Sequence, residues 1–387
     1  MREAHLYRCR VWVLLILIGA SASAAQAQLS TEDHLAEPGF WATQDRASRQ
    51  EFTGPEACAI CHATKFQSQK DTPMAQTLIP TRLADILHEH PTLSFKTGKY
   101  NYQIHTKGQE SSYSVSDGSR KLSYPLTWAF GTSRVAQSYL FKAPEGGFLE
   151  SRATYFTHLS NLEFTPARAL TSPSSLEEAM YRPVGSAEIV RCFACHSTAS
   201  SIGGHFDEQH LIPGVTCEAC HGPGANHVTA MDSPQATKSA NLKPAIFNSG
   251  HLSPADSVDF CGACHGSWWD VKLAGVKGVS TARSAPYRLV TSKCWGSKGD
   301  TRLTCTACHD PHKQLQTEAS AYDQKCLACH ANSPGSKMTT SHTGVVCPKA
   351  SSNCTSCHMP KVNVPEMHAD FTDHRIRIVK PGEAFPE

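Results

Sequence analysis

The stretch CEACHGPGANH, from Cys217 to His227, contains one copy of a pattern that recurs along this chain. The pattern is C-x-x-C-H, two cysteines three positions apart followed at once by a histidine, and it occurs seven times. With 17 Cys and 21 His among 387 residues, only about 0.04 copies would arise by chance from the product of the residue frequencies. The repeats therefore mark sites that need two thiols and an imidazole at a fixed spacing.

Two thiols at this spacing reach the two vinyl groups of one haem, and the adjacent histidine binds its iron. The pattern therefore predicts seven covalently attached haem c groups, with the motif cysteines as attachment points and the motif histidines as first axial ligands. Zinc binding and thioredoxin-like redox chemistry also use C-x-x-C, but neither requires a histidine in the fifth place. The seven motifs are CAICH (Cys58, Cys61, His62), CFACH (Cys192, Cys195, His196), CEACH (Cys217, Cys220, His221), CGACH (Cys261, Cys264, His265), CTACH (Cys305, Cys308, His309), CLACH (Cys326, Cys329, His330) and CTSCH (Cys354, Cys357, His358).

Residues 1–27 are expected to be a secretory signal peptide. Basic residues come first (Arg2, Arg8 and Arg10), then the apolar run VWVLLILIGA, then small residues. That order is typical of a signal peptide, and ten apolar residues are too few to span a bilayer. We place the cleavage near Ala27, with Ala24 as the alternative.

The rest of the sequence predicts a protein outside the cytoplasm without a membrane span. That compartment permits both covalent haem attachment and disulfides, and the periplasm, the outer membrane and the cell exterior all stay open as locations. The formal charge of +2 lies within the signal peptide, so the remaining polypeptide is neutral. Haem propionates would make the loaded protein negative, which gives no support to nucleic-acid binding.

The motifs are unevenly spaced, and this predicts the domain organisation. The first begins at Cys58, and the other six fall within residues 192–358, at about 28 residues per haem, too few to enclose each ring in its own domain. We expect a mainly α and irregular multihaem cytochrome c with a haem-built core, short motif helices and little sheet. The predicted divisions are a first haem segment (28–91), a small β-rich module (92–165) and a six-haem cytochrome block (166–387).

The β-rich module is predicted from alternating apolar residues. KYNYQIH alternates Tyr100, Tyr102 and Ile104, and SYSV repeats the pattern at Tyr113 and Val115. SYLF (138–141), the turn PEGG (144–147) and FLESRATYF (148–156) follow as a hairpin signal.

The second axial ligands decide what each iron can do. With a protein side chain on both faces the iron only exchanges electrons, whereas an open face can bind a substrate. A histidine a few residues past its own motif cannot reach the far face of that haem and suits a neighbour instead, so His227 and His312 are expected to be distal ligands. For the first haem, Met74, His88 and His90 are the alternatives, with a histidine favoured; Met359 is too close to His358.

Other side chains have open assignments. His251 is a candidate ligand for a neighbouring haem, and for four more histidines a ligand role and a structural role stay equally open: His105, His158, His205 and His210. After the haem thiols and Cys9 are set aside, Cys294 and Cys347 remain, and an even remainder in an oxidising compartment favours a disulfide. The alternatives are two thiols, or Cys294 as a redox or ligand residue beside a haem.

Several segments resemble secreted bacterial multihaem cytochromes c, the group that includes hydroxylamine oxidoreductase, pentahaem nitrite reductase and the tetrahaem cytochrome partnering the former. The segments are CEACHGPGANH, CTACHDPH, CTSCHMPK, the tail HADFTDHRI (His368 to Ile376) and WAFGTSRVAQSYLF. The resemblance implies a pairing of Cys294 with Cys347. It also implies distal ligation by His227, His312, His342 and one or both of His368 and His374, with His374 favoured.

These features predict an electron-transfer protein that exchanges electrons with a protein donor and a protein acceptor through closely packed, mostly bis-His haems. The alternative is an oxidoreductase that acts on a small nitrogen or sulfur compound at one open haem, with catalytic residues unknown. No C-x-x-C-K motif of the nitrite-reductase kind occurs. A third hypothesis is a β-rich module that binds a partner or a polysaccharide.

Overall fold

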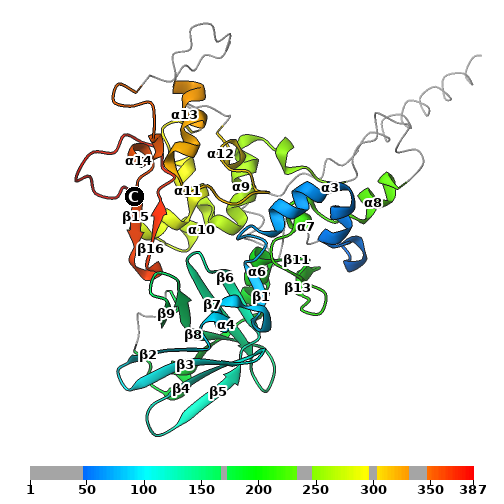
Figure 1. Ribbon diagram of the computed structural model, residues 1–387, viewed down its shortest axis with the longest axis vertical. Coiled ribbons are helices and arrows are strands. Elements are labelled where there is room, and N and C mark those ends of the chain that lie inside the picture. Colours follow the sequence, from blue (N-terminus) through cyan, green and yellow to red (C-terminus); the bar gives the residue numbers. More distant parts are fainter. Residues whose placement is uncertain (1–46, 167–171, 233–245, 296–302, 331–346) are drawn as a thin grey trace, which may run out of the picture.

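The computed structural model describes residues 47–166, 172–232, 246–295, 303–330 and 347–387. Figure 1 shows two regions, with long strands gathered at the lower end and the helices that carry the motifs above them. The motif helices come from both before and after the strands in the sequence, so the chain leaves the helical region and returns to it.

The long strands form two antiparallel sheets. One has the order β1-β6-β7-β8-β10, with β9 also paired to β8, and the other has the order β2-β3-β4-β5. The strands of the first sheet are β1 (Leu78–Pro80), β6 (Trp128–Thr132), β7 (Ala136–Lys142), β8 (Phe148–Phe156), β9 (Asn161–Phe164) and β10 (Tyr181–Val184). Those of the second are β2 (Thr92–Thr97), β3 (Tyr100–Lys107), β4 (Glu110–Ser116) and β5 (Lys121–Pro125).

The predicted alternation produces these strands. Along β3 every second residue is buried, beginning with Tyr100, Tyr102 and Ile104, because successive side chains of a strand point to opposite faces. These side chains share one hydrophobic core with Tyr139 and Phe141 of β7 in the other sheet. The strands predicted around residues 100–105, 113–115, 138–141 and 148–156 are thus confirmed.

The sheet content is larger than expected, which corrects the prediction of a mainly α fold with a small β-rich part. Strand accounts for 25% of the structure. β1 and β10 join the first sheet from outside residues 92–165, and three short ladders lie among the motif helices. Strands of two to four residues carry no readable alternation, and they form because a partner strand supplies their hydrogen bonds. The ladders pair β11 (Ser197–Thr198) with β14 (Ile212–Pro213), β12 (Ser201–Ile202) with β13 (His205–Phe206), and β15 (Lys361–Val364) with β16 (Ala369–Thr372).

The helices are short, as predicted, and seven of them carry the motifs. The motif helices are α3 (Pro55–Lys70), α6 (Ser186–His196), α7 (Cys217–His221), α9 (Pro254–His265), α12 (Cys305–Cys308), α13 (Asp323–His330) and α14 (Cys354–His358). The other α-helices of the described residues are α4 (Asp85–Glu89), α5 (Leu176–Met180), α8 (Ala225–Met231), α10 (Trp268–Leu273) and α11 (Ala285–Val290).

One apolar cluster joins the sheets to the motif helices. Leu78, Trp128 and Leu140 of the first sheet pack against Ile189 and Phe193 of α6. Phe193 is fully buried, and burial of such a side chain contributes about 1.5–3 kcal/mol. The sheet therefore supports the helix that carries the second motif.

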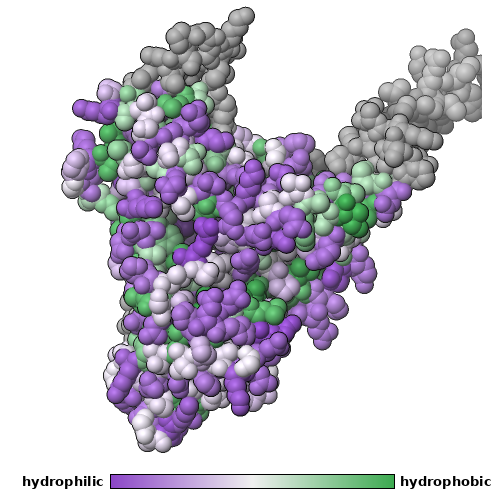
Figure 2. Space-filling model, viewed as in Figure 1, coloured by the Kyte–Doolittle hydropathy of each residue, from purple (hydrophilic) through white to green (hydrophobic). Residues whose placement is uncertain are grey.

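The surface is mainly polar. Figure 2 shows hydrophilic side chains across the visible face, with apolar groups in small separate patches, one of them over α8, where Met231 is 38% exposed. Within the described residues, none of the helices is both long and apolar enough to cross a bilayer.

Candidate haem sites

Each motif histidine lies at the end of a helical segment. Five of the motif helices end at the histidine itself, α12 ends one residue earlier, and α3 has non-helical dihedrals at His62, where two helical segments meet. Positions i, i+3 and i+4 share one face of a helix, so each motif presents both thiols and the imidazole on the same side. This arrangement is the one that a covalently attached haem requires.

Glycine follows the motif histidine in two helices and allows the chain to turn away. Gly222 after α7 and Gly266 after α9 have φ angles of 73° and 80°, in the left-handed region. A side chain at Gly266 would also meet the Ser284 hydroxyl at 2.5 Å. Both positions therefore need glycine, which lets the chain turn away at the helix end.

The motifs contact one another through their cysteines. Contact with the Cys217 thiol is the largest of the effects that raise the pKa of Cys58, and contact with Cys195 likewise raises the pKa of Cys264. Four such thiol pairs link motifs from different helices: Cys58 with Cys217, Cys195 with Cys264, Cys261 with Cys305, and Cys326 with Cys354. Attachment points of different motifs thus lie side by side.

Two carboxylates hold motif helices together. Glu218, inside the third motif, is fully buried and accepts hydrogen bonds from the backbone N–H groups of Thr53 and Gly54 at 2.9 and 2.8 Å, at the start of α3. Asp323 of α13 accepts bonds from the N–H groups of Asn353 and Cys354 at 2.8 and 2.9 Å, at the start of α14. A carboxylate from one motif helix therefore caps the helix of another.

Three motif histidines each face a second histidine ring. His62 faces His227 with ring centroids 6.4 Å apart and planes at 19°. His221 faces His312 at 6.1 Å and 14°, and His309 faces His374 at 6.2 Å and 46°.

These separations fit two imidazoles on opposite faces of one metal. An imidazole nitrogen binds a first-row metal at about 2 Å, and with about 1.1 Å more to each ring centroid, two axial rings have centroids roughly 6 Å apart. All three pairs meet that condition. The residues present therefore fit an iron held between a motif histidine and a histidine from another segment.

Hydrogen bonds set the orientation of several of these rings. Nδ1 of His221 donates to the Phe247 carbonyl at 3.0 Å, and Nδ1 of His374 donates to that of Thr372 at 3.0 Å. His196 and His358 each contact a backbone carbonyl in the same way: Thr77 at 3.2 Å and Arg377 at 2.9 Å. A proton on Nδ1 leaves Nε2 with the lone pair that a metal ligand needs.

Burial favours the neutral form of these rings. It lowers the pKa of His196, His309 and His374, because the charged imidazolium is disfavoured away from water. A neutral imidazole is the form that binds a metal ion.

The predicted distal ligands divide into three groups. His227, His312 and His374 are brought to motif histidines, as described above, although their binding of iron stays a prediction. His342 lies outside the described residues. His368 follows β15 at a left-handed φ of 47°, and its ring packs edge-on against Phe156 of β8, 4.7 Å away, so the structure places it against the sheet.

The structure places the His227 ring opposite His62, and ligation of the first haem by Met74, His88 or His90 stays untested. Nε2 of His88 contacts the Arg82 carbonyl at 3.0 Å, and Nε2 of His90 contacts the Tyr155 hydroxyl at 3.1 Å. Closeness in sequence was the reason for choosing them, but α4 folds onto the sheets.

Three of the other histidines, including the ligand candidate His251, have local partners. His105 contacts Thr92, His210 contacts Asp207 and His251 contacts Asn248. Cys294 and Cys347 are not joined to each other in the structure, so their disulfide stays a prediction. The two capping carboxylates were not predicted, although Glu218 is an acidic residue within a motif.

Parts of the chain are similar to known cytochromes. Residues 162–222, which contain the second and third motifs, match the family described as cytochrome c554 and c-prime. The multiheme cytochrome MtrA of Shewanella baltica (strain OS185) is 25% identical over 206 residues, which are 43% of this chain and 59% of that protein. The chain thus matches about three fifths of the length of that relative.

A solved structure, that of the outer cell wall cytochrome OcwA, superposes with a TM-score of 0.45 at 15% identity, covering 86% of this chain and 80% of that one. Seven C-x-x-C-H motifs, paired histidine rings and these sequence matches together identify the chain as a multihaem c-type cytochrome.

Proposed function

We propose that this chain binds seven haem c groups and transfers electrons through them, outside the cytoplasm, between a protein donor and a protein acceptor. When bound, each haem supplies reversible one-electron exchange between ferric and ferrous iron. The polypeptide provides the attachment thiols and the axial imidazoles, and it keeps neighbouring motifs together.

The contacts between motif thiols carry this proposal. The four thiol pairs join the first motif to the third, the second to the fourth, the fourth to the fifth, and the sixth to the seventh. Two further neighbours complete the set, because Cys220 lies close enough to raise the pKa of Cys261, and Cys308 close enough to raise that of Cys326. No motif stands apart, so groups attached to these thiols would lie close together along one connected path.

The histidine pairs favour electron transfer over catalysis. At three motifs a second ring faces the motif histidine at the separation expected for axial ligands, which would leave neither face of that iron open to a substrate. A location outside the cytoplasm is supported by the signal-like residues 1–27 and by the chemistry of covalent haem attachment.

Haem stoichiometry and ligand binding of the purified protein test the proposal. The intact mass and the pyridine haemochrome absorbance are expected to give seven haems per chain, and electron paramagnetic resonance (EPR) to show low-spin ferric iron that is indifferent to cyanide and nitrite. A polypeptide without haem, or with zinc in its place, would overturn the proposal. A high-spin signal that responds to nitrite would instead favour the oxidoreductase alternative.

A further inference from the structure

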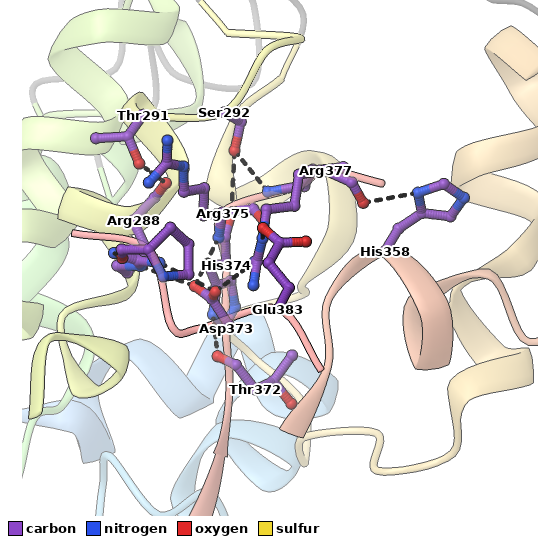
Figure 3. A network of polar contacts seen from close by, with 12 residues as sticks. Arg288, Thr291, Ser292, His358, Thr372, Asp373, His374, Arg375, Arg377 and Glu383 are labelled. Carbon is purple, nitrogen blue, oxygen red and sulfur yellow. Dashed lines mark hydrogen bonds and ion pairs between the residues drawn. The ribbon is translucent and has the colours of Figure 1, made fainter. Parts of the chain in front are cut away.

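A short segment near the C-terminus connects two candidate iron sites. This strap, defined as Asp373 to Arg377, follows β16 and lies between α11 and α14 (Figure 3). On the α14 side, the Arg377 N–H donates to the His358 carbonyl at 3.2 Å. On the α11 side, the Ser292 hydroxyl donates to the His374 carbonyl at 3.2 Å and accepts from the Ile376 N–H at 2.8 Å.

The strap supplies one group to each of two sites. The His374 ring faces His309 of the fifth motif, with centroids 6.2 Å apart. The Arg377 carbonyl accepts a hydrogen bond at 2.9 Å from Nδ1 of His358, the histidine of the seventh motif. A shift of the strap would therefore move the His374 ring at the fifth motif. It would also move the Arg377 carbonyl that orients His358 at the seventh motif.

Asp373 anchors the strap through a buried ion-pair network. Its side chain and that of Arg288 are both fully buried, and two parallel bonds of 2.8 and 3.0 Å join the guanidinium to the two carboxylate oxygens. Arg377 donates to the same carboxylate at 2.6 Å, and the Arg375 N–H does so at 3.0 Å. Two parallel guanidinium–carboxylate bonds fix direction as well as distance, so this contact orients the strap on α11.

The guanidinium of Arg288 is also held from its other sides. It donates to the Pro386 carbonyl at 2.9 Å, and it lies over the Phe385 ring, 4.4 Å from the centroid. Its contacts within the protein therefore fix Arg288, and Asp373 binds to a rigid partner.

We propose that Asp373 is a positioning residue for two haem irons, acting through the His374 ring at the fifth motif and through the His358 hydrogen bond at the seventh. This inference rests on the proposed function, because it requires both histidines to bind iron. The carboxylate acts on both sites through the strap, because it accepts hydrogen bonds from the Arg375 N–H and from the Arg377 side chain. Removing its charge leaves the buried Arg288 guanidinium without its carboxylate partner, which loosens the strap.

The test compares wild-type holoprotein with Asp373→Asn by haem content, EPR and potentiometric titration. The variant is expected to retain seven haems, with altered low-spin signals and shifted reduction potentials at two of them and unchanged values at the other five. The variants His374→Ala and His358→Ala assign the two affected signals, the first by a change of spin state and the second by loss of a haem. A variant whose seven signals and potentials all match the wild type would overturn the inference.

Two further variants keep the test decisive. Glu383→Gln is the matched control, because Glu383 pairs with Arg377 at 3.6 Å without contacting the strap backbone, and it should leave all seven potentials unchanged. If Asp373→Asn does not fold, Ser292→Ala removes two strap bonds without burying a charge and should shift the signal of the fifth motif; no shift there would overturn the inference. Wild-type protein without haem would instead count against the proposed function.

Discussion

The rings of His62 and His227 lie nearly parallel, at 19°, with their centroids 6.4 Å apart. His62 belongs to the first motif, whereas His227 lies on α8, directly after the third motif. Because Cys58 of the first motif also contacts Cys217 of the third, the two motifs share both a thiol contact and a ring pair. The first site therefore depends on residues far away in sequence.

His227→Ala should convert one haem in seven to a high-spin form that binds cyanide, because one face of the first iron would lose its ring. EPR and cyanide titration of the holoprotein measure this. His205→Ala is the control, since His205 is an exposed residue of β13, and it should leave every haem low-spin. A fully low-spin His227→Ala protein would show that another residue binds this iron.

Glu218→Gln should lower the free energy of unfolding by about 2–3 kcal/mol, because an amide cannot accept all the backbone N–H groups that this buried carboxylate accepts. Besides Thr53 and Gly54, the N–H of Gly224 donates to it at 2.8 Å. Thermal melting of the holoprotein measures the effect. Glu56→Gln changes an exposed acid in the first turn of α3 and should leave the melting temperature unchanged; equal losses in both variants would argue against the capping role.

Asp323→Asn should lower the melting temperature at neutral pH, and the difference should disappear in acid. The N–H groups of Cys354 and Asn353 bind the carboxylate and lower the pKa of Asp323. A lowered pKa stabilises the folded protein above the ordinary Asp value of about 3.9, and this stabilisation is lost as the pH falls through the folded-state pKa. The difference in melting temperature between wild type and Asp323→Asn should thus stay constant from neutral pH down to about pH 5 and narrow below about pH 4.

The matched control for that experiment is Asp85→Asn, which alters an exposed acid in the first turn of α4. Its melting curves should follow the wild type at every pH. A gap between Asp323→Asn and wild type that persists unchanged through pH 3 would mean that the carboxylate charge does not stabilise the start of α14.

His196→Ala should lose axial ligation at the second motif and reduce the haem content of the purified protein. Its ring is half-buried and bonded through Nδ1 to the Thr77 carbonyl, which orients the imidazole. Lys361→Ala removes an exposed side chain of β15 and should leave the haem content intact. Haemochrome absorbance per mole of chain compares the two, and equal haem contents would contradict the assignment of His196.

The motif spacing and the alternation of apolar residues are both local patterns, and the sequence reveals them directly. The spacing marks the cysteine and histidine sets, and the alternation around Tyr102 and Tyr113 predicts two strands. The spacing also indicates that His227 and His312 serve neighbouring motifs, because a few residues of chain cannot reach from a motif to the far face of its own haem. The structure brings these rings to His62 and His221.

Which motif each ring faces depends on contacts between distant segments, and no local pattern encodes them. His90 was a reasonable candidate by distance along the chain, but it lies against Tyr155 of β8. The edge strands β1 and β10 are three and four residues long, too short for alternation to be seen. The cap formed by Asp323 is likewise visible only when α13 and α14 are side by side.

In all three ring pairs the second histidine is downstream of its motif: His227 after His62, His312 after His221, and His374 after His309. A polypeptide exported from its N-terminus would therefore present each attachment motif to the maturation machinery before the ring that closes that site has emerged. Under the proposed function, the two cysteines and the first histidine of a motif would then be available to hold a haem before the second ring arrives. Arrival of the later segment would close the site, so the order of translocation matches an order of assembly in which covalent attachment precedes completion of the coordination sphere.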